Sequence, residues 1–143
     1  MRTFSLNEAN MLLPVLESLL RTGLDANQQL QDAQRELQEA RQHVFLSGGG
    51  LLRVSSMLAL QKRIEKASQR RQDALAEIDS MGVQIKDLEI GLLDFPCQMD
   101  DQLILLCWKL GESSIGYWHT VEDGFQGRRP IDANFAGPEV KPS

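Results

Sequence analysis

The chain has few cysteines, few aromatic residues and no long apolar run. Two cysteines and two histidines occur among 143 residues, and aromatic residues make up 6% of the total. No run approaches the roughly 18 apolar residues of a membrane span, and the N-terminus lacks the apolar stretch of a signal peptide. Two cysteines are also too few for a disulfide framework. We therefore expect a cytoplasmic protein with reduced thiols and no membrane association.

The charge balance is acidic, which argues against a dedicated nucleic-acid binder. The formal net charge is −5 at pH 7 and the isoelectric point is about 5.0, whereas nucleic-acid binders show a net basic face. A run of basic residues between Arg53 and Arg71 could meet phosphates. Pairing with the acidic residues Asp32, Glu36 and Glu39 is the interpretation that we favour, so we do not expect nucleic acid as a partner.

The first half of the chain has the periodicity of helices. Ser5-Leu6-Asn7-Glu8 is a capping box that predicts a helix start, and Pro14 within the following pattern predicts a kink or a short first segment. Apolar residues then recur at alternating spacings of three and four, as in a coiled-coil seam. The residues of this seam are Ala26, Leu30, Ala33, Leu37, Ala40 and Val44.

A glycine-rich turn separates this helix from a second one. Ser47-Gly48-Gly49-Gly50 predicts the turn, because consecutive glycines are unfavourable inside a helix. The second helix is expected from about Leu51 to Met81, where Gly82 supplies a common helix end. Two helices of similar length on either side of a short turn predict a long antiparallel, coiled-coil-like hairpin over residues 1–81.

The pattern changes at Gly82 to short apolar runs of strand length. These runs cover residues 83–87, 91–97, 103–109 and 115–121, and turn residues such as Asp100-Asp101 separate them. Because short connections join antiparallel strands, residues 82–135 predict a three- or four-stranded antiparallel β-meander. The fold class is therefore α+β in a single domain, and residues 136–143 are expected to be disordered.

Several separated motifs resemble a bacterial family that is known only as a domain of unknown function. The resemblance covers nearly the whole chain and implies the hairpin-plus-sheet layout but no activity. One departure is Asp100-Asp101, where the family pattern would have Asp-Gly at the hairpin. The motifs are Phe4-x-x-x-Glu8-Ala9-Asn10, Gly82-Val-x-Ile-Lys86-Asp87-Leu88, Gly91-Leu-x-Asp94-Phe95-Pro96, Leu106-Cys107-Trp108-x-x-Gly111-Glu112, Trp118-His119 and Gly124-Phe125-x-Gly127-Arg128.

Ionisable residues on the predicted strands suggest a small polar site. Asp94, Glu112 and His119 could gather there with Arg128 folding over them, because a carboxylate can orient an imidazole and raise its pKa. Arg128 would bind a carboxylate or a phosphate. The alternative is structural: Asp94 caps a turn, Glu112 lies in solvent and His119 hydrogen-bonds within the sheet.

The strand register decides which of these residues share a face. A two-residue turn at Asp100-Asp101 places Asp94 opposite Cys107. A four-residue loop at Gly111–Ser114 places Cys107 opposite Trp118, so that Trp108 and His119 share the other face. A loop that differs by one residue puts Cys107 and His119 on the same face, where they could form a nucleophile–base pair. Cys107 could equally be a small buried hydrophobe.

The remaining candidates have structural alternatives as well. Trp108 and Trp118 could offer an aromatic platform or fill the core. Lys86 and Asp87 could form an ion-pair lock or a plain connection between helix and sheet. Metal-binding spacings such as C-x-x-C or H-E-x-x-H are missing, so we expect no structural zinc.

The sequence does not identify a ligand or a reaction. We expect a non-catalytic interaction or ligand-sensing module with its polar site on the sheet, and a homodimer formed through the exposed apolar stripe of the hairpin. A small acidic ligand or a protein could be the partner. The alternative function is a small metal-dependent or acid/base enzyme that uses Asp94, Glu112 and His119.

Overall fold

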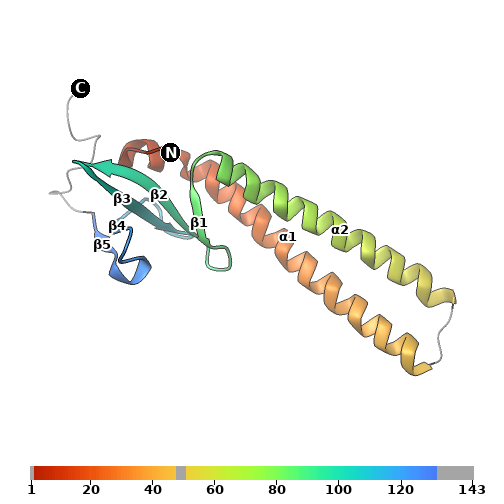
Figure 1. Ribbon diagram of the computed structural model, residues 1–143. Helices are drawn as coiled ribbons and strands as arrows, with labels where there is room; N and C mark the ends of the chain where they lie inside the picture. The colour runs from red at the N-terminus through yellow and green to blue at the C-terminus, as the bar shows by residue number, and fades with distance from the viewer. Residues whose placement is uncertain (1, 48–50, 132–143) are drawn as a thin grey trace. The chain divides into compact units, whose positions relative to one another are not determined.

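Two helices precede five strands and a short 3-10 helix in the computed structural model, which describes residues 2–47 and 51–131 (Figure 1). The fold is the α+β arrangement of a helical hairpin and an antiparallel sheet that the sequence predicts. The elements are α1 (Leu6–Ser47), α2 (Leu51–Ser80), β1 (Gln84–Asp87), β2 (Leu92–Met99), β3 (Gln102–Lys109), β4 (Tyr117–Thr120), η1 (Phe125–Gly127) and β5 (Arg129–Pro130).

The chain divides into two compact units. The sheet unit joins Met1–Leu20 with Leu75–Ser143, and the helical unit is Arg21–Ala74. The start of α1 and the end of α2 therefore belong to the sheet unit and contribute to its core. Every candidate site residue also belongs to the sheet unit. The predicted disordered tail, residues 136–143, lies outside the described residues.

The capping box at the start of α1 is confirmed. The amide of Glu8 donates to Ser5 Oγ at 3.0 Å, and the amide of Ser5 donates to Glu8 Oε1 at 2.9 Å. The helix then continues through Pro14 and Gly23, so the predicted short first segment is wrong. Proline removes one backbone hydrogen bond, while the buried side chains of Leu13, Leu16 and Leu20 hold this stretch against the core.

We expect Ser5→Ala to lower the free energy of unfolding by about 1 kcal/mol, because it removes the acceptor of an N-cap hydrogen bond. The backbone bond from Ser5, followed by its side-chain bond, lowers the pKa of Glu8 from 4.5. The contribution of the Glu8 carboxylate is therefore present above about pH 4.5 and is lost as the pH falls through the lowered folded pKa. Urea unfolding of Ser5→Ala and Glu8→Gln between neutral and acid pH measures both effects. Equal destabilisation by Glu8→Gln at every pH would contradict this.

The helices of the second unit pair in antiparallel fashion, as predicted. Arg63 pairs with Glu36 and Arg70 pairs with Asp25, so the partner position on α1 falls as the position on α2 rises. Small residues lie buried in this unit, which allows a close approach of the two helices. The predicted turn at Gly48–Gly50 lies outside the described residues. The buried positions of the predicted α1 seam are Ala26, Leu30, Ala33 and Leu37, and Ala67 and Ala74 are buried on α2.

The sheet has five antiparallel strands in the order β1-β2-β3-β4-β5, one more than the upper number that the sequence predicts. The two-residue turn at Asp100-Asp101 is confirmed, because Met99 pairs with Gln102, and Asp94 consequently lies opposite Cys107. Asp100 adopts a φ of 55°, a left-handed conformation that aspartate tolerates better than most residues.

Seven residues, 110–116, connect β3 and β4, and the register differs by one residue from that of the predicted four-residue loop. Cys107 lies opposite Tyr117, not Trp118, and His119 lies opposite Leu105. The backbone around Ile115 is bound elsewhere: its amide donates to Asn10 Oδ1 at 2.8 Å. The pairing with β3 therefore resumes only at Tyr117. This shift puts Cys107 and His119 on one face, the alternative that the sequence left open.

The other face of the sheet forms the core of the first unit. Phe95 contacts Phe4 edge-on, with ring centroids 5.6 Å apart. The register places Trp118 on this face with Trp108, so the expectation of opposite faces for the two tryptophans is wrong. Within residues 2–47 and 51–131, no helix combines the length and apolarity needed to cross a membrane.

Candidate functional site

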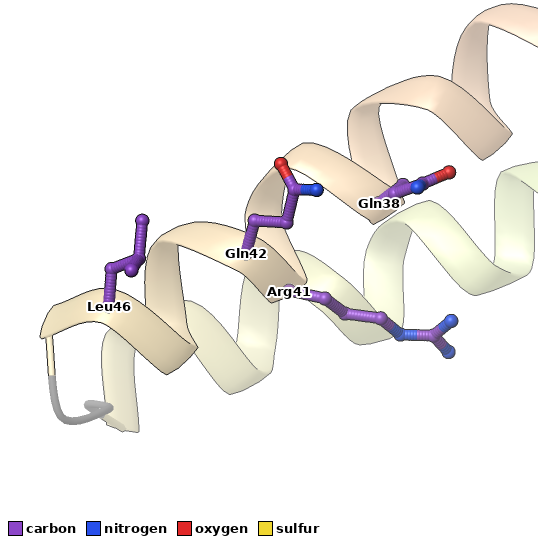
Figure 2. Close-up of a pocket in the computed structure, with 4 residues that line it drawn as sticks. All are labelled: Gln38, Arg41, Gln42 and Leu46. Carbon is purple, nitrogen blue, oxygen red and sulfur yellow. The ribbon is translucent and has the colours of Figure 1, made fainter.

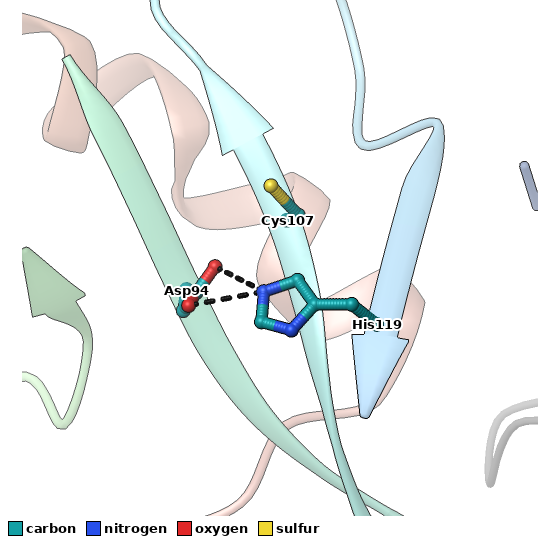
Figure 3. A group of neighbouring side chains, drawn as sticks. All are labelled: Asp94, Cys107 and His119. Atoms are coloured by element: carbon teal, nitrogen blue, oxygen red, sulfur yellow. Dashed lines mark hydrogen bonds and ion pairs between the residues drawn. The ribbon is translucent and has the colours of Figure 1, made fainter. Parts of the chain in front are cut away.

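Three adjacent strands place Asp94, Cys107 and His119 side by side (Figure 3). Asp94 comes from β2, Cys107 from the central β3 and His119 from β4, all on the face opposite the core. Their exposed fractions are only 1%, 0% and 2%. One ligand-type atom from each of the three lies within 4.8 Å of the others. We call this group the polar cluster.

Both ring nitrogens of His119 are engaged. Nδ1 lies 2.8 Å from the carbonyl oxygen of Thr120, and because a carbonyl only accepts, Nδ1 must carry a hydrogen. Nε2 lies 3.1 and 3.2 Å from the two carboxylate oxygens of Asp94. Two unprotonated groups would repel each other at these distances, so a proton lies between Nε2 and the carboxylate. The pair is thus an imidazolium with a carboxylate, or an imidazole with a carboxylic acid.

Burial governs the electrostatics of Asp94. Desolvation raises the pKa of this carboxyl, while the charge and hydrogen bond of His119 lower it in part, followed by the charge of Lys86. Burying an ionised carboxylate is unfavourable unless a cation compensates it. Burial therefore favours the protonated form of the Asp94 carboxyl.

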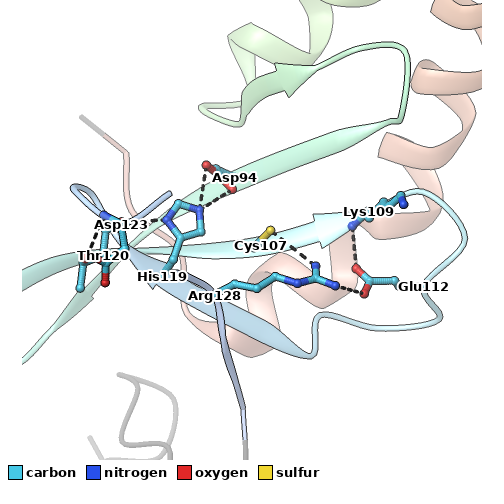
Figure 4. Close-up of polar contacts among 8 residues, drawn as sticks. All are labelled: Asp94, Cys107, Lys109, Glu112, His119, Thr120, Asp123 and Arg128. Carbon is cyan, nitrogen blue, oxygen red and sulfur yellow. Dashed lines mark hydrogen bonds and ion pairs between the residues drawn. The ribbon is translucent and has the colours of Figure 1, made fainter. Parts of the chain in front are cut away.

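Cys107 lies between the histidine pair and Arg128 (Figure 4). Burial raises the pKa of its thiol to about 11, although a hydrogen bond from Arg128 acts in the opposite direction. Nη1 of Arg128 lies 3.8 Å from Sγ. The guanidinium also stacks on the rings of Tyr117 and Phe125, with its carbon 3.8 and 4.6 Å from their centroids. The thiol is therefore protonated at neutral pH and covered by a stacked cation.

We expect Cys107 to resist iodoacetamide in the folded chain at neutral pH, because the reactive species is the thiolate and the sulfur is fully buried. Peptide mapping by mass spectrometry distinguishes Cys107 from Cys97. Labelling should become complete in urea, which serves as the control. Rapid labelling of Cys107 in the native protein would instead identify an activated nucleophile.

Glu112 belongs to a second pair and not to the histidine pair. Its Oε2 lies 3.5 Å from Nη2 of Arg128, and its Oε1 accepts from the Lys109 amide at 2.7 Å. The four residues of the predicted site, Asp94, Glu112, His119 and Arg128, thus lie as two pairs, and Cys107 lies between the pairs. Glu112 also shapes the turn after β3, so its role is partly structural.

The secondary candidates have mainly structural contacts. Asp87 Oδ1 accepts from the amides of Glu89 and Ile90, at 2.9 and 3.4 Å, and so shapes a turn. The indole of the buried Trp108 donates to the Glu112 carbonyl at 2.9 Å. Trp118 packs at the core, with the Arg129 guanidinium 5.0 Å from its ring. Lys86 is exposed and contributes to the site through its charge near Asp94.

Sequence reasoning missed two contributors. The carbonyl of Thr120 fixes the protonation of His119, and a backbone group leaves no trace in a sequence. Phe125 forms one side of the stack around Arg128. The motif Gly124-Phe125-x-Gly127-Arg128 was the available signal, since it places an aromatic residue three positions before the arginine.

The helical unit has a separate hollow along α1. Figure 2 shows Gln38, Arg41, Gln42 and Leu46, which line it. Leu46 is 82% exposed, which is unusual for a large apolar side chain and typical of a contact surface. The four lining residues are two amides, one cation and one apolar side chain, and they do not form an acid–base pair.

Comparison with known proteins yields one family. Residues 2–131 match the model of a family described as "Uncharacterized conserved protein (DUF2203)". No curated protein and no solved structure matches the chain. The match covers most of the chain, including every residue of the polar cluster, and confirms the resemblance to a family of unknown function.

Proposed function

Since the chain belongs to the uncharacterized conserved family DUF2203, whose description names no activity, we propose a function from the site itself. The protein is a non-catalytic ligand-sensing module, and its polar cluster on the C-terminal sheet is the ligand site. The observation that carries this proposal is the hydrogen bonding of His119, which engages both ring nitrogens inside a buried cluster.

A buried cluster of this kind suits binding better than turnover. A general base must reach the proton of a substrate, whereas Nε2 of His119 faces Asp94 at 3.1 Å and both side chains are almost fully buried. A nucleophilic cysteine must be a thiolate, whereas Cys107 is a thiol at neutral pH. A small cation can replace the shared proton, and a small anion can pair with Arg128, without needing a large cavity.

The segment that covers the cluster provides a way to report binding. Arg128 connects the sulfur of Cys107 to Glu112 and stacks on Tyr117 and Phe125. A ligand that changes the charge at Cys107 therefore changes the hydrogen bond of Arg128 directly. The response spreads over residues 117–128, which include His119 and the side chains that contact Arg128.

Amide NMR shifts of residues 117–128 test this proposal. The purified chain is titrated separately with Co²⁺, inorganic phosphate and succinate, which represent a cation, an inorganic anion and a small acid. We expect at least one probe to shift these amides with saturation, and Arg128→Ala to weaken its binding about tenfold, the value of one charged hydrogen bond. Arg129→Ala is the matched control, because this neighbouring arginine contacts Trp118 and Asp123 instead. If no probe shifts these amides at millimolar concentration, the sensing function is rejected.

An acid/base or metal-dependent enzyme is the second candidate. The contact between Asp94 and His119 favours it, because such pairs tune imidazoles for proton transfer. It ranks lower because Glu112, the third residue of that hypothesis, pairs with Arg128 and Lys109.

We further propose that the chain is a cytoplasmic homodimer from a bacterial family. Two buried cysteines that form no disulfide suit a reducing compartment. Large apolar side chains are exposed near the end of α1 and the start of α2, where self-association through a coiled-coil-like surface would cover them. These side chains are Leu46, Val54 and Leu58, with exposed fractions of 82%, 50% and 56%.

Light scattering after size exclusion tests the dimer. We expect about twice the chain mass of 16.1 kDa at micromolar concentration, and a shift toward the chain mass in the double variant Leu46→Glu, Leu58→Glu. Met11→Glu is a suitable control, since Met11 is 72% exposed but lies in the other unit. A single-chain mass for the wild type would contradict the proposal.

A further inference from the structure

The polar cluster combines one nitrogen, one oxygen and one sulfur donor from three adjacent strands. We propose that it is a binding site for a divalent ion of the zinc type, with Nε2 of His119, a carboxylate oxygen of Asp94 and Sγ of Cys107 as ligands. The inference rests on the proposed sensing function, because it names the ligand of that same site.

The geometry requires only a small contraction. Zinc binds nitrogen and oxygen at about 2.0–2.2 Å and sulfur at about 2.3 Å in a tetrahedral arrangement, which puts neighbouring ligand atoms roughly 3.3–3.6 Å apart. Nε2 of His119 and Oδ1 of Asp94 are already 3.1 Å apart, and all three ligand atoms lie within 4.8 Å of one another. Movements of about 1 Å would therefore bring the three ligand atoms to the distances that a bound zinc ion requires. Because the ligands stand on paired strands, their spacing is well defined.

The hydrogen bonding of His119 supports a metal independently of these distances. A histidine that binds metal through one nitrogen usually donates its other N–H to a carbonyl or a carboxylate. Nδ1 of His119 donates to the Thr120 carbonyl, so Nε2 is the ring nitrogen that faces the carboxylate of Asp94 and is placed to bind an ion. A positive centre must lie between them, and a metal ion can take the place of the shared proton.

Charge balance fits a divalent ion. An ion of charge +2 with the thiolate of Cys107, the carboxylate of Asp94 and a neutral imidazole gives a net charge of zero, which suits a buried site. Binding releases the thiol proton and the shared proton to solvent. Arg128 then donates to a thiolate, and its own charge is compensated by Glu112 at 3.5 Å.

The types of donor atom in the polar cluster determine which ions it would bind. Calcium and magnesium prefer oxygen ligands in larger numbers, whereas a nitrogen–sulfur–oxygen set suits zinc and its spectroscopic substitute cobalt. The spacing rules for metal motifs did not reveal the set, because its members are 13 and 12 residues apart along the chain (94 to 107 and 107 to 119) and come together only through strand pairing.

Cobalt absorption tests the site in the full chain after treatment with a chelator. We expect one equivalent of Co²⁺ to produce a thiolate-to-cobalt charge-transfer band in the near ultraviolet and the visible bands of a four-coordinate ion. One equivalent of Zn²⁺ should abolish both. A second measurement uses the wild type alone: the ring nitrogens of His119 should shift with Zn²⁺ in NMR, while those of His43 should not.

Two of the three metal-binding residues have a matched control residue of the same type elsewhere in the chain. Cys107→Ser should remove the charge-transfer band, whereas Cys97→Ala, on the other face of the sheet, should keep it. His119→Gln should weaken Co²⁺ binding at least 100-fold, whereas the other histidine variant, His43→Gln, should leave it unchanged. Circular dichroism confirms that each variant is folded, and the wild-type NMR measurement decides the matter if one is not.

The outcomes separate the metal site from the sensing function. A charge-transfer band that depends on Cys107, with a zinc-dependent shift of His119, supports the metal site. Absence of the band, or a band that survives Cys107→Ser, overturns it. If phosphate or succinate shifts the amides of residues 117–128 while cobalt does not bind, the sensing function stands and the metal site fails. If zinc binds as predicted without affecting the amides of residues 124–128, which lie beyond the ligand His119, the metal site stands and the sensing function fails.

Discussion

Asp94→Ala is expected to lower the free energy of unfolding by about 3–5 kcal/mol, the usual effect of removing one partner from a buried ion pair. The substitution leaves Nε2 of His119 without its hydrogen-bond partner in a place where the ring is 2% exposed. The ring cannot turn to find another partner without breaking the bond from Nδ1 to Thr120, which is 2.8 Å long. Urea unfolding followed by tryptophan fluorescence, with chelator present, measures the change.

Asp94→Asn is the matched variant for this prediction. The asparagine amide has nearly the same shape and can donate a hydrogen bond to the lone pair of Nε2, so the pair becomes neutral but stays satisfied. We expect a loss of only about 1–2 kcal/mol, the difference between a charged and a neutral hydrogen bond. Equal losses for Ala and Asn, or no loss for Ala, would show that the pair does not exist as described.

A stable fold does not require this pair, which strengthens the functional interpretation. Buried ion pairs are often no more stabilising than apolar residues of similar volume, and the face opposite the cluster shows that this sheet can be filled with Leu93, Phe95 and Leu106. A chain selected for stability alone has no need of an acid, a thiol and an imidazole together. The proposed binding function would explain their convergence.

Local patterns made most of the fold predictable. The capping box predicted the start of α1. The apolar residues at alternating spacings of three and four predicted the helical hairpin. The continuous α1 was not predictable from Pro14, because the proline rule is local. Burial of Leu13, Leu16 and Leu20 against the sheet compensates for the lost hydrogen bond, and those contacts are with residues far along the chain.

The residue types of the candidate site could be predicted from the sequence, but the strand register that brings them together could be predicted only in part. The turn at Asp100-Asp101 placed Asp94 opposite Cys107 correctly, because a two-residue turn determines the register of a hairpin. No comparable rule predicts the register across the loop after β3. Its backbone is bound by the side chains of Glu112 and Asn10, and the latter is 105 residues away. That long-range contact lies in the connection across which the register places Cys107 and His119 on one face.

Gly91→Ala is expected to destabilise the sheet by about 2–5 kcal/mol. Gly91 has a φ of 69°, which is unfavourable by about 1–2 kcal/mol for a residue with a side chain. An added Cβ would also lie 2.5 Å from Cβ of Leu110, and such overpacking adds about 1–3 kcal/mol. The backbone cannot move away easily, because the Leu110 amide donates to the Gly91 carbonyl at 2.9 Å. Urea unfolding measures the loss.

Gly124→Ala separates the two causes. Gly124 has nearly the same φ, 67°, but a Cβ there would have no heavy atom within 4 Å. Its ψ of −166° places it in a region that is essentially restricted to glycine, so the variant should lose only the backbone part, about 1–3 kcal/mol. A larger loss for Gly91→Ala than for Gly124→Ala then indicates the contact with Leu110. Since Gly91 and Leu110 flank β2 and β3, which carry Asp94 and Cys107, a strained contact there should also weaken cobalt binding. Equal losses for the two variants would show that Leu110 does not restrict this turn.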